Sequence, residues 1–222
     1  MSKHLIHHIT HVRNLPGILA EGGIWCDRES FDKALCRQSI GYADIKGRRG
    51  KRPVQRLFGQ SIAAGGMVSD YVPFYFCNRS PMLGAISQGK VPSFDGGEEE
   101  VVYLVSTAER IAMTDLVWCF TDGHAAEPMT DFFDDLKDLD QVDWKAVETW
   151  KWGGRWRLND PDITRRKQAE FLVHEYFPLS EVLGFAVMTI AMSERVSNLL
   201  MEAGSPFERK IKILPEWYYN SQ

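Results

Sequence analysis

Four of the six histidines of this chain, His4, His7, His8 and His11, lie close together near its start. On a helix this spacing would place all four on one face, where they could bind a metal ion. The β-branched residues between them favour a strand instead, on which His4 and His8 face one side and His7 and His11 the other. Neither pair then has an obvious carboxylate or thiolate partner. We therefore expect no metal site here.

A second group with possible chemistry surrounds Glu170, which opens the apolar run "EFLV" and follows Arg165, Arg166 and Lys167. An acid that enters an apolar strand is costly unless it is paired or has a function. One interpretation is an ion-paired or exposed residue at the edge of a sheet. The other is a carboxylate that orients a sugar hydroxyl and stabilises developing positive charge. The pattern alone leaves both open.

Two further segments carry cations. The segment 46–56, "KGRRGKRPVQR", has many cations and no acid, which suits either a solvated loop or contact with phosphates. The segment 150–157, "WKWGGRWR", alternates tryptophan with cations, as in platforms that stack single-stranded nucleic acid. The same tryptophans could equally form one end of the core. The net charge of −4 argues against a generally basic nucleic-acid binder, although a locally basic surface remains compatible with it.

Short elements must position these residues. We expect strands in 4–10, 70–79, 98–106, 116–122, 168–178, 182–189 and 206–220. A helix over 192–204 should follow the strand 182–189, with Ser193 as its N-cap and Gly204 as its end. Shorter helices are expected after Asn14, ending at Gly22, and between residues 106 and 115. Residues 37–70 form a basic connection, and 121–164 form a long insertion. The pattern predicts an α+β fold in a single domain, 1–222.

Composition sets further bounds. With 222 residues, 44% hydrophobic and 25% charged, the chain resembles an ordinary soluble globular protein. Its four cysteines lack CxxC spacing and are expected to be small buried hydrophobes in a reducing compartment. The start of the chain shows no signal peptide, and the longest apolar stretch, 182–192, is too short to span a bilayer. We expect a cytoplasmic protein with no membrane contact.

Several segments, in order, resemble the DarT family of DNA ADP-ribosyltransferase toxins. They are "HITHVRNLPGIL", "DIKGRR", "DYVPFYFCNRSPML", "DGHA" and "RRKQAEFLVHEYFP". The resemblance implies an ADP-ribosyltransferase fold, with two small abutting, mostly antiparallel sheets flanked by short helices around a cleft for NAD. It implies transfer of ADP-ribose to a base in single-stranded DNA, with release of nicotinamide. It also implies a macrodomain antitoxin, DarG, as partner. We expect a monomer that uses NAD as co-substrate and no metal.

The resemblance also assigns an NAD-binding strand. His8 would contact a ribose hydroxyl on the adenosine side, the backbone of Ile9 would bind the nicotinamide amide, and Thr10 would support it. Ile9 replaces the glycine of the wider superfamily. Asn14 and Leu15 match the family's next turn and are expected near the cofactor.

The resemblance implies a catalytic pair as well. Glu170 would hydrogen-bond the ribose 2′-hydroxyl and stabilise the oxocarbenium-like centre. Arg49, or its neighbour Arg48, would be the second essential residue. Because arginine is a poor unaided base, we expect Arg49 to position the base and stabilise its charge. Tyr75 would pack on the nicotinamide, with Tyr71 as the competing choice.

The DNA-binding residues implied by the resemblance and by the tryptophan segment come from several parts of the chain. The insertion 121–164 takes the place of the family's substrate-recognition loop. The candidates are Arg48, Arg79, Met82, His124, Trp152 and Arg155. Thymidine is the expected target, with guanosine as the alternative. An RNA or protein substrate, or a non-catalytic nucleic-acid-binding protein of this fold, remain open alternatives.

Overall fold

The computed structural model describes residues 4–60, 62–92, 94–204 and 210–220. Its strands are β1 (Leu5–His11), β2 (Gly23–Trp25), β3 (Tyr71–Tyr75), β4 (Val101–Thr107), β5 (Trp118–Thr121), β6 (Phe132–Phe133), β7 (Glu170–His174), β8 (Tyr176–Pro178), β9 (Gly184–Val187) and β10 (Ile211–Ile213). Its α-helices are α1 (Leu15–Ala20), α2 (Asp27–Asp32), α3 (Ala43–Arg49), α4 (Pro81–Ser87), α5 (Ala108–Ile111), α6 (Trp144–Glu148), α7 (Trp156–Asn159), α8 (Ile163–Lys167) and α9 (Ile190–Glu202). The 3-10 helices are η1 (Val12–Asn14), η2 (Val68–Asp70), η3 (Glu98–Glu100), η4 (Leu136–Gln141), η5 (Leu179–Glu181) and η6 (Pro215–Trp217).

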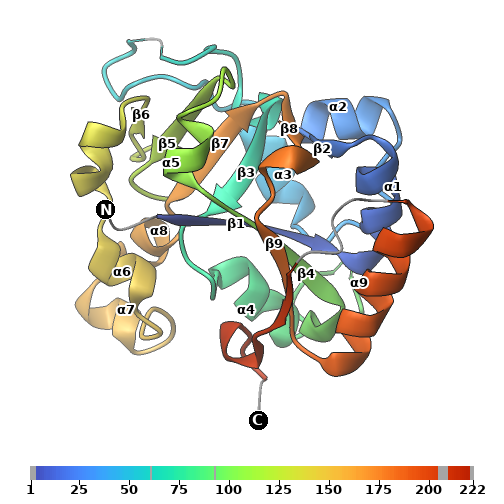
Figure 1. Cartoon of the computed structure of the whole chain (residues 1–222). Coiled ribbons are helices and arrows are strands. Elements are labelled where there is room, and N and C mark those ends of the chain that lie inside the picture. The colour runs from blue at the N-terminus through green and yellow to red at the C-terminus, as the bar shows by residue number, and fades with distance from the viewer. Residues whose placement is uncertain (1–3, 61, 93, 205–209, 221–222) are drawn as a thin grey trace.

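Eight strands are hydrogen-bonded in the order β10-β9-β4-β1-β3-β7-β5-β6, and β2 and β8 form a separate pair (Figure 1). Every pairing is antiparallel except that of β9 with β10. The central strands β1 and β3 share a single residue pair, His7 with Tyr75. The large sheet is therefore two four-stranded halves that abut at one point. This arrangement confirms the expected α+β fold with mostly antiparallel sheets.

The strand β1 follows the alternation expected from its sequence. Ile6 packs in a core that includes Phe74, Phe171 and Phe177, whereas Ile9 packs on the opposite face in a second core. This confirms the strand period of two, which places neighbouring side chains on opposite faces. A third core lies around Tyr71, on the other half of the sheet.

Pro73 sits inside β3, where a proline would normally break the pairing of a central strand. The backbone of Phe74 and Phe76 faces β7, since Phe76 N donates to Ala169 O at 3.1 Å, and so the backbone of Pro73 faces β1. At Pro73 the strands β1 and β3 have already separated. The missing N–H therefore costs no ladder bond.

The run 168–178 was expected to be one strand, and this is wrong. It forms β7 and β8, which belong to different sheets. Glu175 between them has φ +57°, which turns the chain out of the extended conformation. Its backbone is fixed by Asp70 O and Cys26 N, each at 2.8 Å.

The helix over 192–204 is confirmed, but it begins earlier than expected. Thr189, not Ser193, is the N-cap, and its side chain accepts from Met192 N at 3.1 Å. Gly204 follows the helix with φ +59°, as expected for its end. Of the final strand expected over 206–220, residues 211–213 form β10, and residues 206–209 lie outside the described part.

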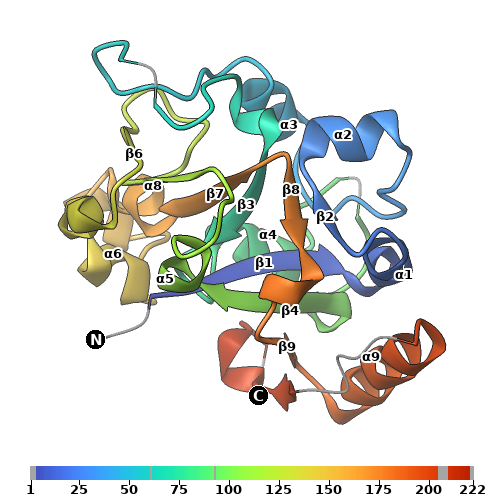
Figure 2. The ribbon, with the colours of Figure 1, turned by 45° about the horizontal axis from the view of Figure 1, so that its top comes forward.

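The helices form two groups around the centre of the sheet. Helices α1, α2 and α3 lie on one side of β3, and α6, α7 and α8 of the insertion region lie on the other (Figures 1 and 2). The basic connection 37–70 is not wholly irregular, because it contains α3 and η2. No helix in the described ranges is long and apolar enough to cross a membrane.

Candidate active site

A cavity of about 380 Å³ opens where β1 and β3 separate. The strands β1 and β3 form its floor. Residues of α1, of the start of α2 and of α3 form one wall, and residues of the start of the insertion and of α4 form the other. Nine of the predicted site residues line the cavity, namely His8, Ile9, Thr10, Asn14, Arg48, Arg49, Tyr75, Met82 and His124. The sheet and the helix groups thus gather residues from distant parts of the chain.

Glu170, the first residue of β7, has 1% of its surface exposed and is not among the residues that line the cavity, but it contacts Arg49, which is. Its Oε2 accepts from Arg49 Nη1 at 2.7 Å, and its Oε1 accepts from Ala125 N at 2.8 Å. Its own N–H donates to Thr121 Oγ1 at 3.0 Å, which fixes the backbone. Glu170 is therefore ion-paired, as one interpretation expected, but its strand β7 lies between β3 and β5 and not at the edge of the sheet. Each oxygen still has a lone pair that could accept from a ligand hydroxyl.

Arg49 ends α3 with 6% of its surface exposed, and it lines the cavity. Burial alone would lower the pKa of Arg49, but the charges of Glu170 and Asp27 outweigh this and raise it. Its Nε and Nη2 have no hydrogen-bond partner among the described residues. Buried donors are rarely left unsatisfied, so these two indicate a ligand that accepts hydrogen bonds at this position.

His8 lines the cavity from β1, and its Nδ1 lies 2.9 Å from Pro73 O. Burial lowers the pKa of His8, so its ring is neutral near pH 7. Because a carbonyl can only accept, Nδ1 carries the proton and Nε2 is an acceptor. His8 can therefore accept a hydrogen bond from a hydroxyl in the cavity.

The other histidines of the cluster have structural surroundings. His4 Nδ1 lies 2.6 Å from Glu109 Oε1, and His11 Nε2 lies 3.5 Å from Glu100 Oε2. These carboxylates come from distant segments, so the expectation that the cluster lacks such partners is wrong. Each contact involves one carboxylate only. Within the described residues, no group of three or more His, Cys, Asp and Glu side chains is arranged for a metal.

Ile9 lines the cavity although its side chain packs in the core. Ala108 N donates to His4 O at 3.0 Å, so even-numbered residues of β1 turn their backbone to β4. The backbone of Ile9 therefore faces β3, beyond the point where pairing has stopped. Its N–H and C=O are placed to bind a ligand amide, and a glycine is not needed for this.

Thr10 and Asn14 shape the rim of the cavity. Asn14 Nδ2 donates to Thr10 Oγ1 at 3.1 Å and to Gln38 O at 2.8 Å, and Asn14 Oδ1 accepts from Gln38 N at 2.8 Å. These bonds hold the segment after α2 against β1. The amide of Asn14 is thus fully used in positioning. Leu15, by contrast, is completely buried in the core and does not line the cavity.

Of the two candidate tyrosines, only Tyr75 lines the cavity. Its hydroxyl lies 3.9 Å from Met82 Sδ, at the start of α4, where Ser80 caps the helix through Leu83 N. Burial raises the pKa of Tyr75, so its hydroxyl stays protonated. Tyr71 is buried in the third core with its hydroxyl bonded to Gly65 O, so the competing assignment of Tyr71 is not supported.

His124 and Arg48 meet on the insertion side of the cavity. Arg48 Nη1 lies 2.8 Å from Glu127 Oε1, and the same oxygen is 4.0 Å from His124 Nδ1. His124 is 5% exposed, and its Nδ1 has no hydrogen-bond partner among the described residues. Burial lowers the pKa of His124. Arg48 and Arg49 thus have separate positions, and only Arg49 contacts Glu170.

Three predicted DNA contacts lie outside the cavity lining. Trp152 packs against α4 and donates to Tyr219 Oη at 3.1 Å, which is a structural contact. Arg79 lies 5.9 Å from the Tyr219 ring. Arg155 is exposed and lies 4.9 Å from the Trp156 ring.

The sequence did not point to several lining residues. Asp27, Glu127 and Gln168 line the cavity, and Asp27 also lies 3.2 Å from Lys46 Nζ. Gln168 could have been predicted, because it lies two residues before Glu170, the first residue of the strand β7. Asp27 and Glu127 are ordinary surface acids in the sequence, and only the tertiary fold brings them here.

The chain was compared with known proteins. A family model described as "ssDNA thymidine ADP-ribosyltransferase, DarT" matches residues 7–219. The DNA ADP-ribosyl transferase of Thermus sp. (strain 2.9) is 37% identical over 96% of this chain and 95% of that protein. That of Escherichia coli O127:H6 is 36% identical over 87% of this chain and 83% of that protein.

Solved structures agree. Thermus sp. 2.9 DarT in complex with ADP-ribosylated ssDNA superposes with a TM-score of 0.88 at 36% identity, covering 97% of this chain and 96% of that one. The same protein in complex with NAD+ gives a TM-score of 0.84 at 34% identity, covering 97% and 98%. The resemblance seen in the sequence is confirmed. The chain belongs to the DarT family of ssDNA thymidine ADP-ribosyltransferases.

Proposed function

We propose that this chain transfers ADP-ribose from NAD to a thymidine base in single-stranded DNA and releases nicotinamide. The observation that carries this proposal is the buried ion pair of Glu170 and Arg49 at the cavity, with two donors of Arg49 left without a protein partner. Family membership supplies the reaction class. The relatives whose structures contain NAD+ and ADP-ribosylated ssDNA support both substrates.

NAD binds across β1 in this proposal. His8 Nε2 accepts from a ribose hydroxyl, and the free backbone groups of Ile9 bind the nicotinamide carboxamide. Tyr75 provides an apolar aromatic surface for the nicotinamide ring. Thr10 and Asn14 act indirectly, because their hydrogen bonds hold the segment at Gln38 in place.

Glu170 acts on the sugar. When the bond between nicotinamide and ribose breaks, positive charge develops at the anomeric carbon, and a buried carboxylate stabilises it more strongly than water would. Glu170 is already oriented by Arg49 and the N–H of Ala125, so little reorganisation is needed. Nicotinamide leaves as a neutral group and needs no strong acid.

Arg49 acts on the acceptor base. The imide nitrogen of thymine forms a bond to the anomeric carbon as the bond from that carbon to nicotinamide breaks, and its proton is released to solvent. The free guanidinium donors of Arg49 stabilise the negative charge that develops on the base. The charges of Glu170 and Asp27 raise the pKa of Arg49, although burial acts to lower it, so Arg49 stays cationic and serves as an electrostatic partner rather than a base. His124 and Met82 also line the cavity, and we assign them to positioning the base.

The DNA strand is held outside the cavity by cations and aromatic rings. Arg48, Arg79 and Arg155 are candidates for phosphate contacts. Trp150 is 67% exposed, with Lys151 Nζ 5.3 Å from its ring, so it can stack an unpaired base. This assigns stacking to Trp150 instead of Trp152.

The wider biology follows the family. We propose that the chain acts as one domain and as a cytoplasmic monomeric toxin. A macrodomain antitoxin of the DarG type would reverse the modification. A solved DarTG of Thermosipho africanus in complex with ADP-ribose shares the fold at 19% identity.

The test is incubation with NAD and a panel of single-stranded oligonucleotides, analysed by mass spectrometry. Wild type should add one ADP-ribose to one thymidine and release nicotinamide. Glu170→Gln, which keeps the size of the side chain, should lower kcat by about 10²- to 10³-fold or more. Modification of guanosine would correct the base, and labelling of RNA or protein alone would refute the DNA assignment.

A further inference from the structure

Helix α8 carries consecutive cations just before the catalytic strand β7, and Arg165 is the one tied to the active site. Its Nε and Nη2 bind the two oxygens of Asp162, each at 2.8 Å. Its Nη1 lies 3.0 Å from Asp122 Oδ2 and 3.3 Å from Thr130 Oγ1. One guanidinium thus connects α8 with both ends of the segment 122–130.

The backbone of Arg165 holds the same segment from a second direction. Its carbonyl accepts from His124 N at 2.9 Å. A Cβ on Gly123 would lie 2.5 Å from Arg165 Nη1 and 3.0 Å from Arg165 O, so the chain passes directly over the arginine. Thr130 Oγ1 closes the loop by donating to His124 O at 2.8 Å.

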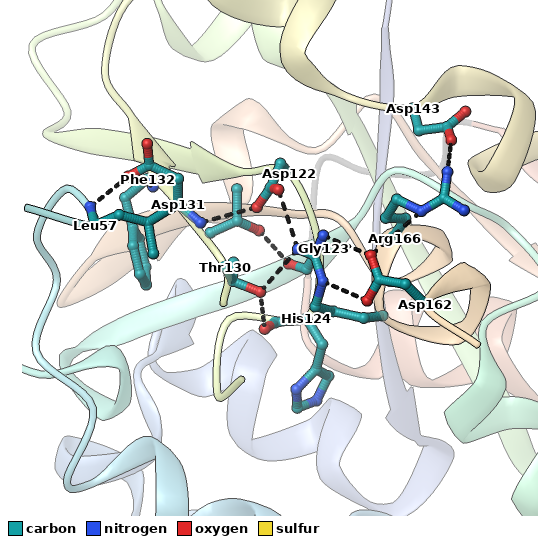
Figure 3. A network of polar contacts seen from close by, with 12 residues as sticks. Leu57, Asp122, Gly123, His124, Thr130, Asp131, Phe132, Asp143, Asp162 and Arg166 are labelled. Atoms are coloured by element: carbon teal, nitrogen blue, oxygen red, sulfur yellow. Dashed lines mark hydrogen bonds and ion pairs between the residues drawn. The ribbon is translucent and has the colours of Figure 1, made fainter. Parts of the chain in front are cut away.

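This segment carries two groups of the proposed mechanism. Ala125 N–H binds Glu170 Oε1, and the ring of His124 projects from the network to line the cavity (Figure 3). Arg165 has no place in the cavity lining, so any effect on the reaction is indirect. The side chain of Arg165 is 15% exposed. Burial acts to lower the pKa of Arg165, but hydrogen bonds and charges from Asp162 and Asp122 outweigh this and raise it.

We propose that Arg165 is a positioning residue, which sets the place of Ala125 and His124 relative to Glu170. This inference rests on the proposed function of Glu170. Two bonds anchor the rigid, planar fork to Asp162 and two hold Asp122 and Thr130 of the segment, an arrangement that a lysine ammonium cannot reproduce. Arg165 therefore determines the rate of the chemical step and not the binding of NAD.

The neighbouring Arg166 offers a matched control. It pairs with Asp143, Asp160 and Asp162, and so it is as heavily bonded as Arg165. It shares Asp162 with Arg165, but none of its three partners lies in the segment 122–130. A role in folding alone would make substitutions at the two arginines equivalent.

The experiment compares Arg165→Lys, Arg166→Lys and Asp122→Asn, with kcat, KM for NAD and Tm measured for each. Arg165→Lys should lower kcat by about 100-fold, as expected for a small misplacement at a reacting centre, with KM for NAD unchanged. Asp122→Asn keeps the ion pair of Arg165 with Asp162, so it should lower kcat less than Arg165→Lys does and should also leave KM for NAD unchanged. Arg166→Lys should lower Tm and keep kcat close to wild type.

Hydrogen exchange of the Ala125 amide gives a readout that does not depend on turnover. The amide should exchange slowly in wild type and in Arg166→Lys, and faster in Arg165→Lys. Wild-type kcat or unchanged Ala125 protection in Arg165→Lys would overturn the inference, as would an equal loss of kcat in Arg166→Lys. If wild type modified no DNA, the proposed function would fail while the amide measurement still tested the positioning role.

Discussion

Glu170 and Arg49, the two residues to which we assign the reaction, form a buried ion pair. Both side chains are largely removed from water, and Glu170 Oε2 lies 2.7 Å from Arg49 Nη1. Removing one partner of such a pair leaves an uncompensated buried charge. The residue proposed to stabilise the reacting sugar is therefore also one on which the stability of the unliganded fold depends.

This coupling predicts a stability effect. Glu170→Gln should lower the free energy of unfolding by about 3 kcal/mol, because Arg49 stays charged without its partner. The double variant with Arg49→Gln should recover part of the loss. Urea unfolding of the single and double variants measures the effect, and equal stability of wild type and Glu170→Gln would contradict it.

A second prediction at the residue scale concerns His8. Asn at position 8 keeps a donor in the place of Nδ1, whereas Gln places a polar group near Nε2. His8→Ala and His8→Asn should weaken NAD binding by up to about tenfold, which is the worth of one hydrogen bond. His8→Gln should retain more affinity. Calorimetric titration measures this, and a chelator should leave the affinity unchanged.

Some of these residues could be identified from the sequence and some could not. Glu170 and Arg49 stand in distinctive segments, and the resemblance named both. Tyr71 and Tyr75 face the same side of β3, so the choice between them depended on which end of the strand meets the cavity, and local sequence does not determine this. Asp27 and Glu127 line the site only because α2 and the insertion fold against it.

At the scale of elements, Glu175 terminates β7, the strand that begins with Glu170. Its φ of +57° separates β7 from β8, although the sequence of the run reads as one continuous strand. The alternation of apolar residues carries no mark of this turn. The strand pattern could not predict that Glu175, a non-glycine residue, adopts the left-handed conformation.

The turn predicts opposite effects of two substitutions. Glu175→Gly should raise the free energy of unfolding by roughly 0.5–1 kcal/mol, because glycine adopts a positive φ without strain. Glu175→Val should lower it by about 1–2 kcal/mol, since a β-branched side chain is disfavoured there. Thermal unfolding of both variants checks the sign.

The insertion predicts a contrast between two tryptophans. Trp150 is exposed, whereas Trp152 packs on α4 near Gly84 and bonds to Tyr219. Trp150→Ala should keep Tm and raise KM for DNA by about tenfold, the worth of one stacked base. Trp152→Ala should lower Tm. The opposite pattern would return the stacking role to Trp152.

The elements themselves were largely predictable because strong local patterns specify them. Residues 4–10 alternate as a strand should, and Gly204 ends α9 as expected. The start of α9 was less clear, because Thr189 and Ser193 can both cap and lie one helical turn apart. The contact between Glu170 and Arg49 joins residues far apart in the sequence and depends on the tertiary fold. Only the family resemblance pointed to these two residues together.

At the scale of the whole molecule, buried histidines make stability depend on pH. Burial lowers the pKa of His7 to about 4, against 6.5 in the unfolded chain. Between these values the unfolded state binds more protons, so stability falls as pH falls through this window. Burial also lowers the pKa of His8 and of His124, which act in the same direction.

This predicts a loss of about 3 kcal/mol from His7 alone between pH 6.5 and 4. His7→Asn keeps a donor toward Tyr75 O and cannot titrate, so its stability should fall less over this range. Urea unfolding at several pH values measures the difference. Identical pH slopes for wild type and His7→Asn would rule out this contribution.

The single contact between β1 and β3 has a consequence for the molecule as a whole. Proteins usually guard the unpaired edges of their sheets at the periphery, where another strand could add to them. Here two such edges face each other in the interior, and the proline in one of them removes a donor that a competing strand would need. In the proposed mode of NAD binding, the carboxamide supplies a donor and an acceptor to the unpaired backbone of β1 and so takes the place of a neighbouring strand.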